Sequence, residues 1–462
     1  MTGDGLRACE EKMRAADVPK AAIDSFRHYY RQLVAGESGL LPEDELEPLD
    51  AVPSWDDLPS ADGGGREELD RTVAIKLNGG LGTSMGMTRA KSLLKVKDGL
   101  TFLDIIARQI LALRRRHGAR LPLVLMNSFY TREDSLAALA RYPELESDVP
   151  LDFVQNKEPK VRVDDLHPVS WPADPELEWC PPGHGDVYTA LVTSGTLEVL
   201  LDRGYRWAFI SNSDNLGAVP ELRILGWLAA ERVPFLMEVA ERTAADRKGG
   251  HLARLGDGRL VLREIAQTPE EDLDSFQDVE RHRYFNTNTL WLDLRALADE
   301  LARRDNVLGL PMIVNRKTVD PSDASSPDVY QLETAMGAAV AVFDGSRALR
   351  VPRERFAPVK TTNELLALRS DCYAIDDDWR VGLAPGRDGG PPFIDLDPAH
   401  YKLVGEFEAR FPSGPPSLAA CRRLVVRGDV VFGAGVVVRG AVELHHPGDG
   451  RVCIEDGAVL EG

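Results

Sequence analysis

Short aliphatic runs and longer amphipathic segments alternate along most of the chain. The runs have the length of strands and occupy residues 73–77, 121–126, 151–155, 206–211, 237–240 and 260–266. The amphipathic segments have the apolar spacing of helices with one buried face and occupy residues 101–116, 131–142, 187–201 and 220–231. This alternation predicts a Rossmann-like α/β fold, in which a doubly wound, mixed but mostly parallel sheet carries helices on both faces.

Two of the predicted helices have distinctive features. The helix at 101–116 starts with the capping pattern of Thr101 and Asp104 and ends before Gly118, and its three final arginines indicate helix-end charge. The segment Gln331–Val342 is rich in small residues and predicts a further helix, packed in the core.

The same pattern divides the chain into three parts. Residues 1–68 predict an acidic, helical leader with a helix at 15–33 and a flexible, glycine-rich break at 61–66. Residues 69–364 carry the alternating pattern and form the main domain. Residues 365–462 combine a connector rich in Asp, Gly and Pro with a C-terminal repeat.

The C-terminal repeat has a period of six residues. Its aliphatic positions are Leu424, Val430, Val436 and Val442, followed after an insertion by Ile454 and Leu460. Turn glycines lie between them. This period predicts a short left-handed β-helix. Because the open ends of such a stack expose pairing edges, the β-helix is also the expected route to a homo-oligomer.

Composition narrows the possible functions. The 462 residues carry a formal net charge of −19, which argues against nucleic-acid and anionic-membrane partners. The five cysteines are scattered and lack C-x-x-C spacing, so neither a disulfide framework nor a zinc site is predicted. There is no apolar run of spanning length and no apolar leader segment, and we expect a cytoplasmic protein.

A glycine-rich loop directly follows the strand at 73–77. The sequence there is Val73-Ala-Ile-Lys-Leu-Asn-Gly-Gly-Leu-Gly-Thr-Ser-Met-Gly86, with Arg89 and Lys91 just beyond. A strand that leads into such a loop is typical of a phosphate cradle, since glycine allows the backbone to approach an anion closely. The spacing matches neither the P-loop nor the dinucleotide motif, so a tight turn without a ligand stays an alternative.

Other polar residues fall where ligands bind in such sheets, just past the strands. Gln155 ends one strand, and Asn212-Ser213-Asp214 ends another. Asp214 beside a phosphate site suggests an intervening Mg²⁺, although a turn-capping role is possible. His184 lies between two glycines before a helix, where it could contact an anion or be structural.

Two further groups are weaker candidates. Gly249, Gly250, Glu264, Asn286 and Asn288 could provide hydrogen bonds and close backbone contact for a sugar. Lys360 follows a proline-containing loop that could close over a triphosphate, or it could be a surface charge.

These motifs together resemble one family. Asn-Gly-Gly-Leu-Gly, Pro-Pro-Gly-His-Gly-Asp, Ser-Asn-Ser-Asp-Asn-Leu-Gly, Phe-Asn-Thr-Asn-Thr-Leu-Trp and Pro-Val-Lys-Thr-Thr occur in the order seen in the eukaryotic-type UTP–glucose-1-phosphate uridylyltransferase (UDP-glucose pyrophosphorylase) family. The resemblance covers most of residues 70–462. Arg89-Ala-Lys-Ser departs from the family's Gly-Pro-Lys-Ser, which puts the placement of Lys91 in question.

The resemblance implies a nucleotidyltransferase domain at 69–364 and a role for each motif. Nucleotide contacts would come from Leu77, Asn78, Gly79, Gly80, Gln155, Gly183 and Asp214. Sugar-phosphate contacts would come from His184, Asn212, Ser213, Gly249, Gly250, Glu264, Asn286 and Asn288. Lys91 and Lys360 would be catalytic, and Asp214 would hold the cofactor Mg²⁺.

The implied reaction joins UTP and glucose 1-phosphate into UDP-glucose and pyrophosphate, reversibly and with Mg²⁺. The sugar phosphate would attack the α-phosphorus of UTP in line. The alternatives are a UDP-sugar enzyme that also accepts galactose 1-phosphate, and a silent sugar-nucleotide-binding or scaffold protein. A hexapeptide-type acyltransferase would need a longer β-helix. Because the chain ends at Gly462, where relatives continue with a further strand, octamer formation is in question.

Overall fold

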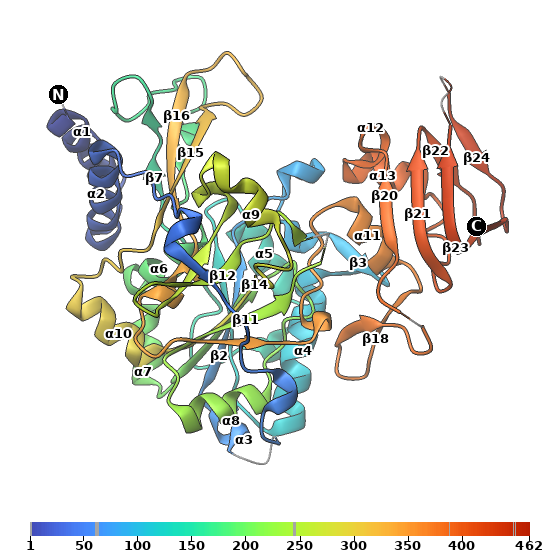
Figure 1. Cartoon of the computed structure of the whole chain (residues 1–462), viewed down its shortest axis with the longest axis horizontal. Helices are drawn as coiled ribbons and strands as arrows, with labels where there is room; N and C mark the ends of the chain where they lie inside the picture. Colours follow the sequence, from blue (N-terminus) through green and yellow to red (C-terminus); the bar gives the residue numbers. More distant parts are fainter. Residues whose placement is uncertain (1, 61–63, 244–245, 388, 447, 449) are drawn as a thin grey trace.

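The computed structural model describes residues 2–60, 64–243, 246–387, 389–446, 448 and 450–462. The N-terminal helices lie at one end of the molecule and the C-terminal strands at the other, with a large sheet between them (Figure 1). The break predicted at 61–66 and the loop at 244–250 lie partly outside the described residues.

The central sheet is mixed and has ten strands. They are β1 Leu46–Pro48, β2 Thr72–Asn78, β5 Leu123–Asn127, β6 Asp152–Val154, β10 Trp207–Asn212, β11 Phe235–Glu241, β12 His251–Leu255, β13 Leu260–Arg263, β14 Tyr284–Asp293 and β17 Arg347–Arg350. Strands β6, β5, β2 and β10 are parallel neighbours. Strand β14 pairs antiparallel with β10 and β11, and β11 pairs parallel with β17. The carboxyl ends of β6, β5, β2 and β10 therefore share one edge.

Both faces of this sheet are covered by helices, which confirms the doubly wound prediction. Ala74 and Leu125 face one apolar cluster, and Val73 and Val124 face the other, as the two-residue period of a strand requires. The first cluster contains residues of α4 Phe102–His117, α8 Leu222–Glu231 and α11 Thr362–Arg369. The second contains residues of α6 Val187–Thr193, α7 Thr196–Asp202 and α10 Leu294–Arg303.

Helix α4 begins as its capping pattern predicts. The Thr101 side chain accepts from the Asp104 backbone, and the Asp104 carboxylate accepts from the Thr101 backbone. The helix expected at 187–201 is instead divided into α6 and α7. Gly195 between them has φ 74°, which a right-handed helix cannot contain.

The prediction of a helix at Gln331–Val342 is wrong. The chain there forms strand β16 Asp328–Thr334, which pairs antiparallel with β15 Met312–Thr318, and then the short 3₁₀ segment Met336–Ala341. Val329, Leu332 and Thr334 of this strand are buried. Pairing with β15 makes this segment a strand, although the small residues that follow it resemble a helix.

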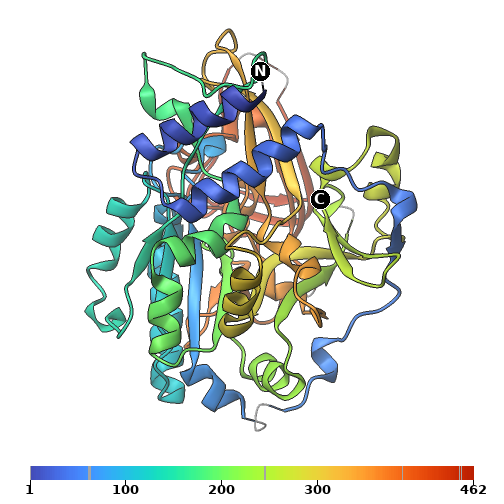
Figure 2. The ribbon, with the colours of Figure 1, turned by 90° about the vertical axis from the view of Figure 1, so that its left-hand side faces the viewer.

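The β15–β16 hairpin supports the N-terminal helices, as Figure 2 shows from the side. Helices α1 Thr2–Ala15 and α2 Lys20–Ala35 bury Cys9, Met13, Phe26 and Tyr30 against Met312 and Leu332 of the hairpin. The sequence predicted α2 but not α1.

Most strands of the C-terminal part stack in parallel. Strands β20 Phe393–Leu396, β21 Cys421–Arg427, β23 Val437–His445 and β25 Val459–Glu461 form one sheet, and β22 Val430–Phe432 pairs with β24 Val452–Ile454. The repeat positions Leu424, Val430, Val436 and Val442 are buried in the same apolar cluster as α4 and α11. The core of the main domain therefore continues into the C-terminal strands.

No helix in the described part of the chain is both long and apolar enough to cross a membrane.

Candidate active site

The glycine loop lies at the carboxyl end of β2 and carries Lys91 against its backbone. The Lys91 N–H donates to the Gly80 carbonyl at 3.0 Å. Gly82 has φ 67°, and a β-carbon added there would stand 3.2 Å from Cγ of Lys91. The glycine thus provides the space in which the Lys91 side chain lies.

Lys91 pairs with Asp214, which follows the neighbouring strand β10. Its Nζ lies 2.6 Å from Oδ2 of Asp214, and both side chains are 18% exposed. The other carboxylate oxygen, Oδ1, is buried and has no hydrogen-bond partner among the described residues. A turn-capping Asp214 would accept a hydrogen bond from a nearby backbone N–H. Among the described residues its carboxylate instead accepts from Lys91.

Gln155 covers the first glycine of the loop. A β-carbon added at Gly79 would stand 3.0 Å from its side-chain Oε1. The Gly79 carbonyl accepts from the Ser128 hydroxyl at 3.0 Å. The Asn78 amide is turned inward and donates to Asn127 Oδ1 and the Ser135 hydroxyl. Asn78 therefore offers a ligand its backbone, not its side chain.

The Gly183-His184 turn reaches the same region from the start of α6. Gly183 has φ 79°, and a β-carbon added there would stand 2.6 Å from the Thr334 carbonyl. Nδ1 of His184 accepts from the Met336 N–H at 3.0 Å. Burial lowers the pKa of His184 to about 4, so its ring is neutral with the proton on Nε2. Such a ring can donate one hydrogen bond to an anion.

The five predicted sugar-contact residues also gather around one glycine. A β-carbon added at Gly250 would stand 2.4 Å from Oε2 of Glu264. The Gly250 carbonyl accepts from the Asn286 N–H at 3.0 Å. Asn286 and Asn288 hydrogen-bond each other at 2.9 Å in both directions, across an irregularity in β14 where Asn288 has φ 54°. Gly249, the fifth, immediately precedes Gly250.

Glu264 is the titratable group of this cluster. Burial raises the pKa of Glu264 to about 7, while the positive charge of Lys360 opposes that shift. The raised pKa allows the carboxyl to carry a proton nearer neutral pH than an ordinary glutamate does. It can both donate and accept hydrogen bonds, which suits a sugar hydroxyl.

Asn212, Ser213 and Lys360 complete the predicted set. Asn212 pairs with Leu77 across β10 and β2, and the Ser213 N–H donates to the Leu77 carbonyl at 3.1 Å. The Val359 N–H donates to the Asp214 carbonyl at 3.2 Å, so the backbone next to Lys360 lies beside Asp214. The side chain of Lys360 is exposed.

The sequence reasoning missed Lys76, which lies beneath this site. Its side chain is 1% exposed, and Nζ donates to the Ser211 hydroxyl at 2.7 Å and to the Ala218 carbonyl at 2.8 Å. Burial, reinforced by the positive charge of Arg355, lowers the pKa of Lys76 to about 7. A lysine inside an otherwise apolar strand run was the signal that could have revealed it.

Asp186 was also missed. Its carboxylate accepts from the backbone N–H of Asn156 at 2.6 Å and from the Asn156 side chain at 2.8 Å, which ties the His184 turn to the strand end at Gln155. Burial raises the pKa of Asp186 to about 7, although the hydrogen bonds from Asn156 oppose the shift. Its place two residues after His184 was the available signal.

The side chains of this site could hold a metal ion only if a bound ligand supplied further oxygen donors. Within the described ranges, no three His, Cys, Asp or Glu side chains group closely enough to hold a metal. The unpartnered Oδ1 of Asp214 is a suitable oxygen donor for Mg²⁺, which commonly binds through one carboxylate together with substrate phosphates. The residues present therefore fit Mg²⁺ held jointly with a nucleotide.

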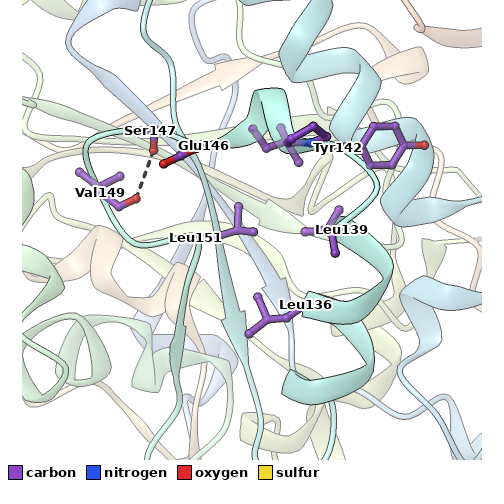
Figure 3. A pocket seen from close by; sticks show the side chains of 10 residues that line it. Leu136, Leu139, Tyr142, Glu146, Ser147, Val149 and Leu151 are labelled. Atoms are coloured by element: carbon purple, nitrogen blue, oxygen red, sulfur yellow. Dashed lines mark hydrogen bonds between the residues drawn. The ribbon is translucent and has the colours of Figure 1, made fainter.

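An apolar cavity of about 370 Å³ lies under α5 Arg132–Leu139. Figure 3 shows Leu136, Leu139 and Leu151 around it. None of its lining residues belongs to the predicted site, so this cavity is separate from it.

A glycine loop, a lysine–aspartate pair and a second lysine at one sheet edge are the parts that a nucleotidyltransferase needs to bind and align phosphate groups. A model of the family UTP–glucose-1-phosphate uridylyltransferase matches residues 23–439. The enzyme of that name from Solanum tuberosum is 41% identical over 423 residues, which cover 91% of this chain and 84% of the potato protein. The chain therefore belongs to the UTP–glucose-1-phosphate uridylyltransferase family.

Solved structures agree with this assignment. A UDP-glucose pyrophosphorylase variant from Leishmania major, in complex with UDP-glucose, has a TM-score of 0.93 and 45% identity, with 99% of this chain and 98% of that chain covered. A UDP-glucose phosphorylase from Trypanosoma brucei has a TM-score of 0.92 and 47% identity over the same shares.

Proposed function

We propose that this enzyme makes UDP-glucose and pyrophosphate from UTP and glucose 1-phosphate, reversibly. The observation that carries the proposal is the Lys91–Asp214 pair against the glycine loop, at the shared edge of β2 and β10. Family membership supplies the substrates: the potato relative carries the name of this activity, and the Leishmania structure holds UDP-glucose.

The nucleotide binds along the glycine loop. The backbone of Leu77 to Gly80 and of Gly183 holds the uridine, and Gln155, which lies over Gly79, reads the edge of the base. The sugar phosphate binds opposite, where the neutral ring of His184 donates to its phosphate together with Asn212 and Ser213. Gly249, Gly250, Glu264, Asn286 and Asn288 surround the glucose.

The reaction needs no general base, because the sugar phosphate is already an anionic nucleophile. Its oxygen forms a bond to the α-phosphorus of UTP while the bond from that phosphorus to the pyrophosphate oxygen breaks, and pyrophosphate leaves with the electron pair. Lys91 and Lys360 align the two polyanions and stabilise the charge of the transition state. Asp214 would hold Mg²⁺ together with the phosphates, and the ion would supply further positive charge there.

The proposal extends to the arrangement of the whole protein. Residues 1–68 form a leader, 69–364 the catalytic domain and 365–462 a connector with a short left-handed β-helix. The parallel stacking of β21, β23 and β25 supports the helical coil, and its last strand is a candidate surface for homo-oligomers. The scattered free cysteines, four of the five buried, support a cytoplasmic location.

Release of pyrophosphate from UTP tests this function. The assay compares glucose 1-phosphate, galactose 1-phosphate and N-acetylglucosamine 1-phosphate in the presence of Mg²⁺, with TTP as the nucleotide control. Release confined to UTP with glucose 1-phosphate is the expected result. Comparable rates with galactose 1-phosphate would instead identify a broad UDP-sugar enzyme, and no release while UTP still binds would identify a silent binding protein.

A further inference from the structure

Asn215, directly after Asp214, joins two loops of the site. Its side chain is 2% exposed and uses both ends of its amide. Nδ2 donates to the Arg355 carbonyl at 3.0 Å. Oδ1 accepts from the Ala357 N–H at 3.0 Å and from the Gly217 N–H at 3.2 Å. Since one end must donate and the other accept, these backbone partners require an amide.

The two loops also touch backbone to backbone around this side chain. Asn215 forms an antiparallel bridge with Pro358, and the Val359 N–H donates to the Asp214 carbonyl at 3.2 Å. A β-carbon added at Gly217 would stand only 2.2 Å from the Glu354 carbonyl oxygen. Residues 214–217 of the loop after β10 are therefore held against residues 354–359.

Each loop carries one charge that the proposed reaction uses. Asp214, paired with Lys91, lies on the first loop. Lys360 directly follows the second, and its side chain is exposed, with Nζ 5.9 Å from the centre of the Phe356 ring. Few contacts among the described residues hold the Lys360 side chain in place, so the position of its backbone decides where its amine can reach. The hydrogen bond that anchors Val359 therefore determines which phosphates Lys360 can contact.

We propose that Asn215 is a positioning residue that fixes the Lys360 loop against the Asp214 loop, so that Lys360 and the Lys91–Asp214 pair act on the same phosphate groups. This inference rests on the role of Lys360 in the proposed function. The residues assigned to uridine and glucose lie outside the clamp. Its loss therefore lowers turnover more than substrate affinity, since the two loops must be aligned in the transition state.

Asn215→Asp is the sharpest variant, because it keeps the shape and places an acceptor opposite the Arg355 carbonyl. Asn215→Ala removes all three hydrogen bonds and serves as the second variant. Tyr205→Phe is the matched control, since it removes one hydrogen bond of 2.7 Å, to Asp148, just before the opposite end of β10. We expect kcat to fall about 10- to 100-fold in both Asn215 variants, with each KM within about threefold of wild type.

A double-mutant cycle with Lys360→Ala separates positioning from general damage. If Asn215 acts through Lys360, Asn215→Asp lowers kcat less than about threefold in the Lys360→Ala background. The same large factor in both backgrounds would overturn the inference and leave the proposed function standing. Near-normal kcat in Lys360→Ala alone would overturn both the inference and the role of Lys360.

Hydrogen exchange gives a readout that does not depend on turnover. The clamp protects the backbone amides of Ala357 and Val359, so exchange in residues 355–360 is faster in both Asn215 variants and unchanged in Tyr205→Phe. Unchanged protection in Asn215→Ala would show that the amide does not hold the loop, which overturns the inference.

Discussion

At the scale of single residues, the site depends on lysines with different surroundings. Lys91 is half-buried against Asp214, Lys360 is exposed, and Lys76 is buried beneath them. In the proposed mechanism only the first two reach the phosphates, whereas Lys76 donates to Ser211 and Ala218, on either side of Asp214. Chemical role therefore follows from the position of each amine, not from the residue type.

Lys91→Ala should lower kcat about 10²- to 10³-fold, because it removes a preorganised charge from the phosphate site. Arg89→Ala is the matched control: it removes an exposed cation, 73% accessible, two residues earlier. Steady-state kinetics and thermal melting of both variants check this. Near-normal turnover in a folded Lys91→Ala enzyme would remove Lys91 from the mechanism.

Glu264 makes stability depend on pH. Its folded pKa of about 7 lies above the value of an unfolded glutamate, so the folded state binds more protons between about pH 4.5 and 7. The contribution of Glu264 to stability therefore falls as pH rises through this window. Glu264→Gln should remove that fall, by about 1–3 kcal/mol at pH 8 relative to pH 5.

Denaturant unfolding of both proteins at the two pH values measures the difference. Equal pH dependence in wild type and Glu264→Gln would mean that Glu264 is not protonated in the folded state.

At the scale of elements, a buried ion pair joins β11 to the loop that leads to Lys360. Arg355 donates to both oxygens of Glu238, at 2.6 and 2.7 Å, and the Trp291 indole donates to the same carboxylate at 2.8 Å. Glu238 is fully buried and Arg355 nearly so. This pair holds the loop at a second point, next to the Asn215 contacts.

Arg355→Met should destabilise the fold by about 3–5 kcal/mol, because it leaves the Glu238 carboxylate buried without its cation. The double variant Arg355→Met with Glu238→Gln should recover part of that loss, since the Glu238 position then carries no charge that needs a partner. Urea unfolding measures both. A cost below about 1 kcal/mol in the single variant would contradict the buried pair.

Element prediction succeeded where the local signals agreed with one another. The β2 run and the α4 cap were visible because hydrophobic period and capping residues agreed. The segment Gln331–Val342 failed because its small residues resemble a helix, whereas pairing with β15 imposes a strand. The Arg355 partner of Asn215 and the Ser211 partner of Lys76 could not be predicted, since each lies more than 100 positions away in the sequence.

The candidate site was likewise predicted where local sequence signals pointed to a residue, and not where long-range contacts decide. Residues next to glycine motifs or strand ends were proposed from the sequence, and the fold brings them to one sheet edge. Two features could be seen only in the structure. They are the inward orientation of the Asn78 side chain toward Asn127 and the hydrogen bond from the Met336 N–H to His184.

At the scale of the whole molecule, one apolar cluster extends from the sheet through α11 into the C-terminal strands. This continuity predicts that the C-terminal repeat unfolds together with the main domain. Val436 is fully buried in that cluster, whereas Val459 in β25 is 51% exposed.

Val436→Asp should therefore lower the melting temperature of the entire protein in a single transition, because it buries an unpaired charge. Val459→Asp, the matched control in the same repeat, should leave it nearly unchanged. Scanning calorimetry checks this. An early, separate transition in Val436→Asp, with the main transition unchanged, would show that the repeat folds independently.

The most direct test of the proposed mechanism is the stereochemistry at the α-phosphorus. UTP of known configuration, with sulfur in place of one α-phosphate oxygen, is converted with glucose 1-phosphate, and the product configuration is read by ³¹P NMR. Direct in-line attack by the sugar phosphate predicts inversion. Retention would mean two successive displacements through a covalent enzyme intermediate, which would contradict the account.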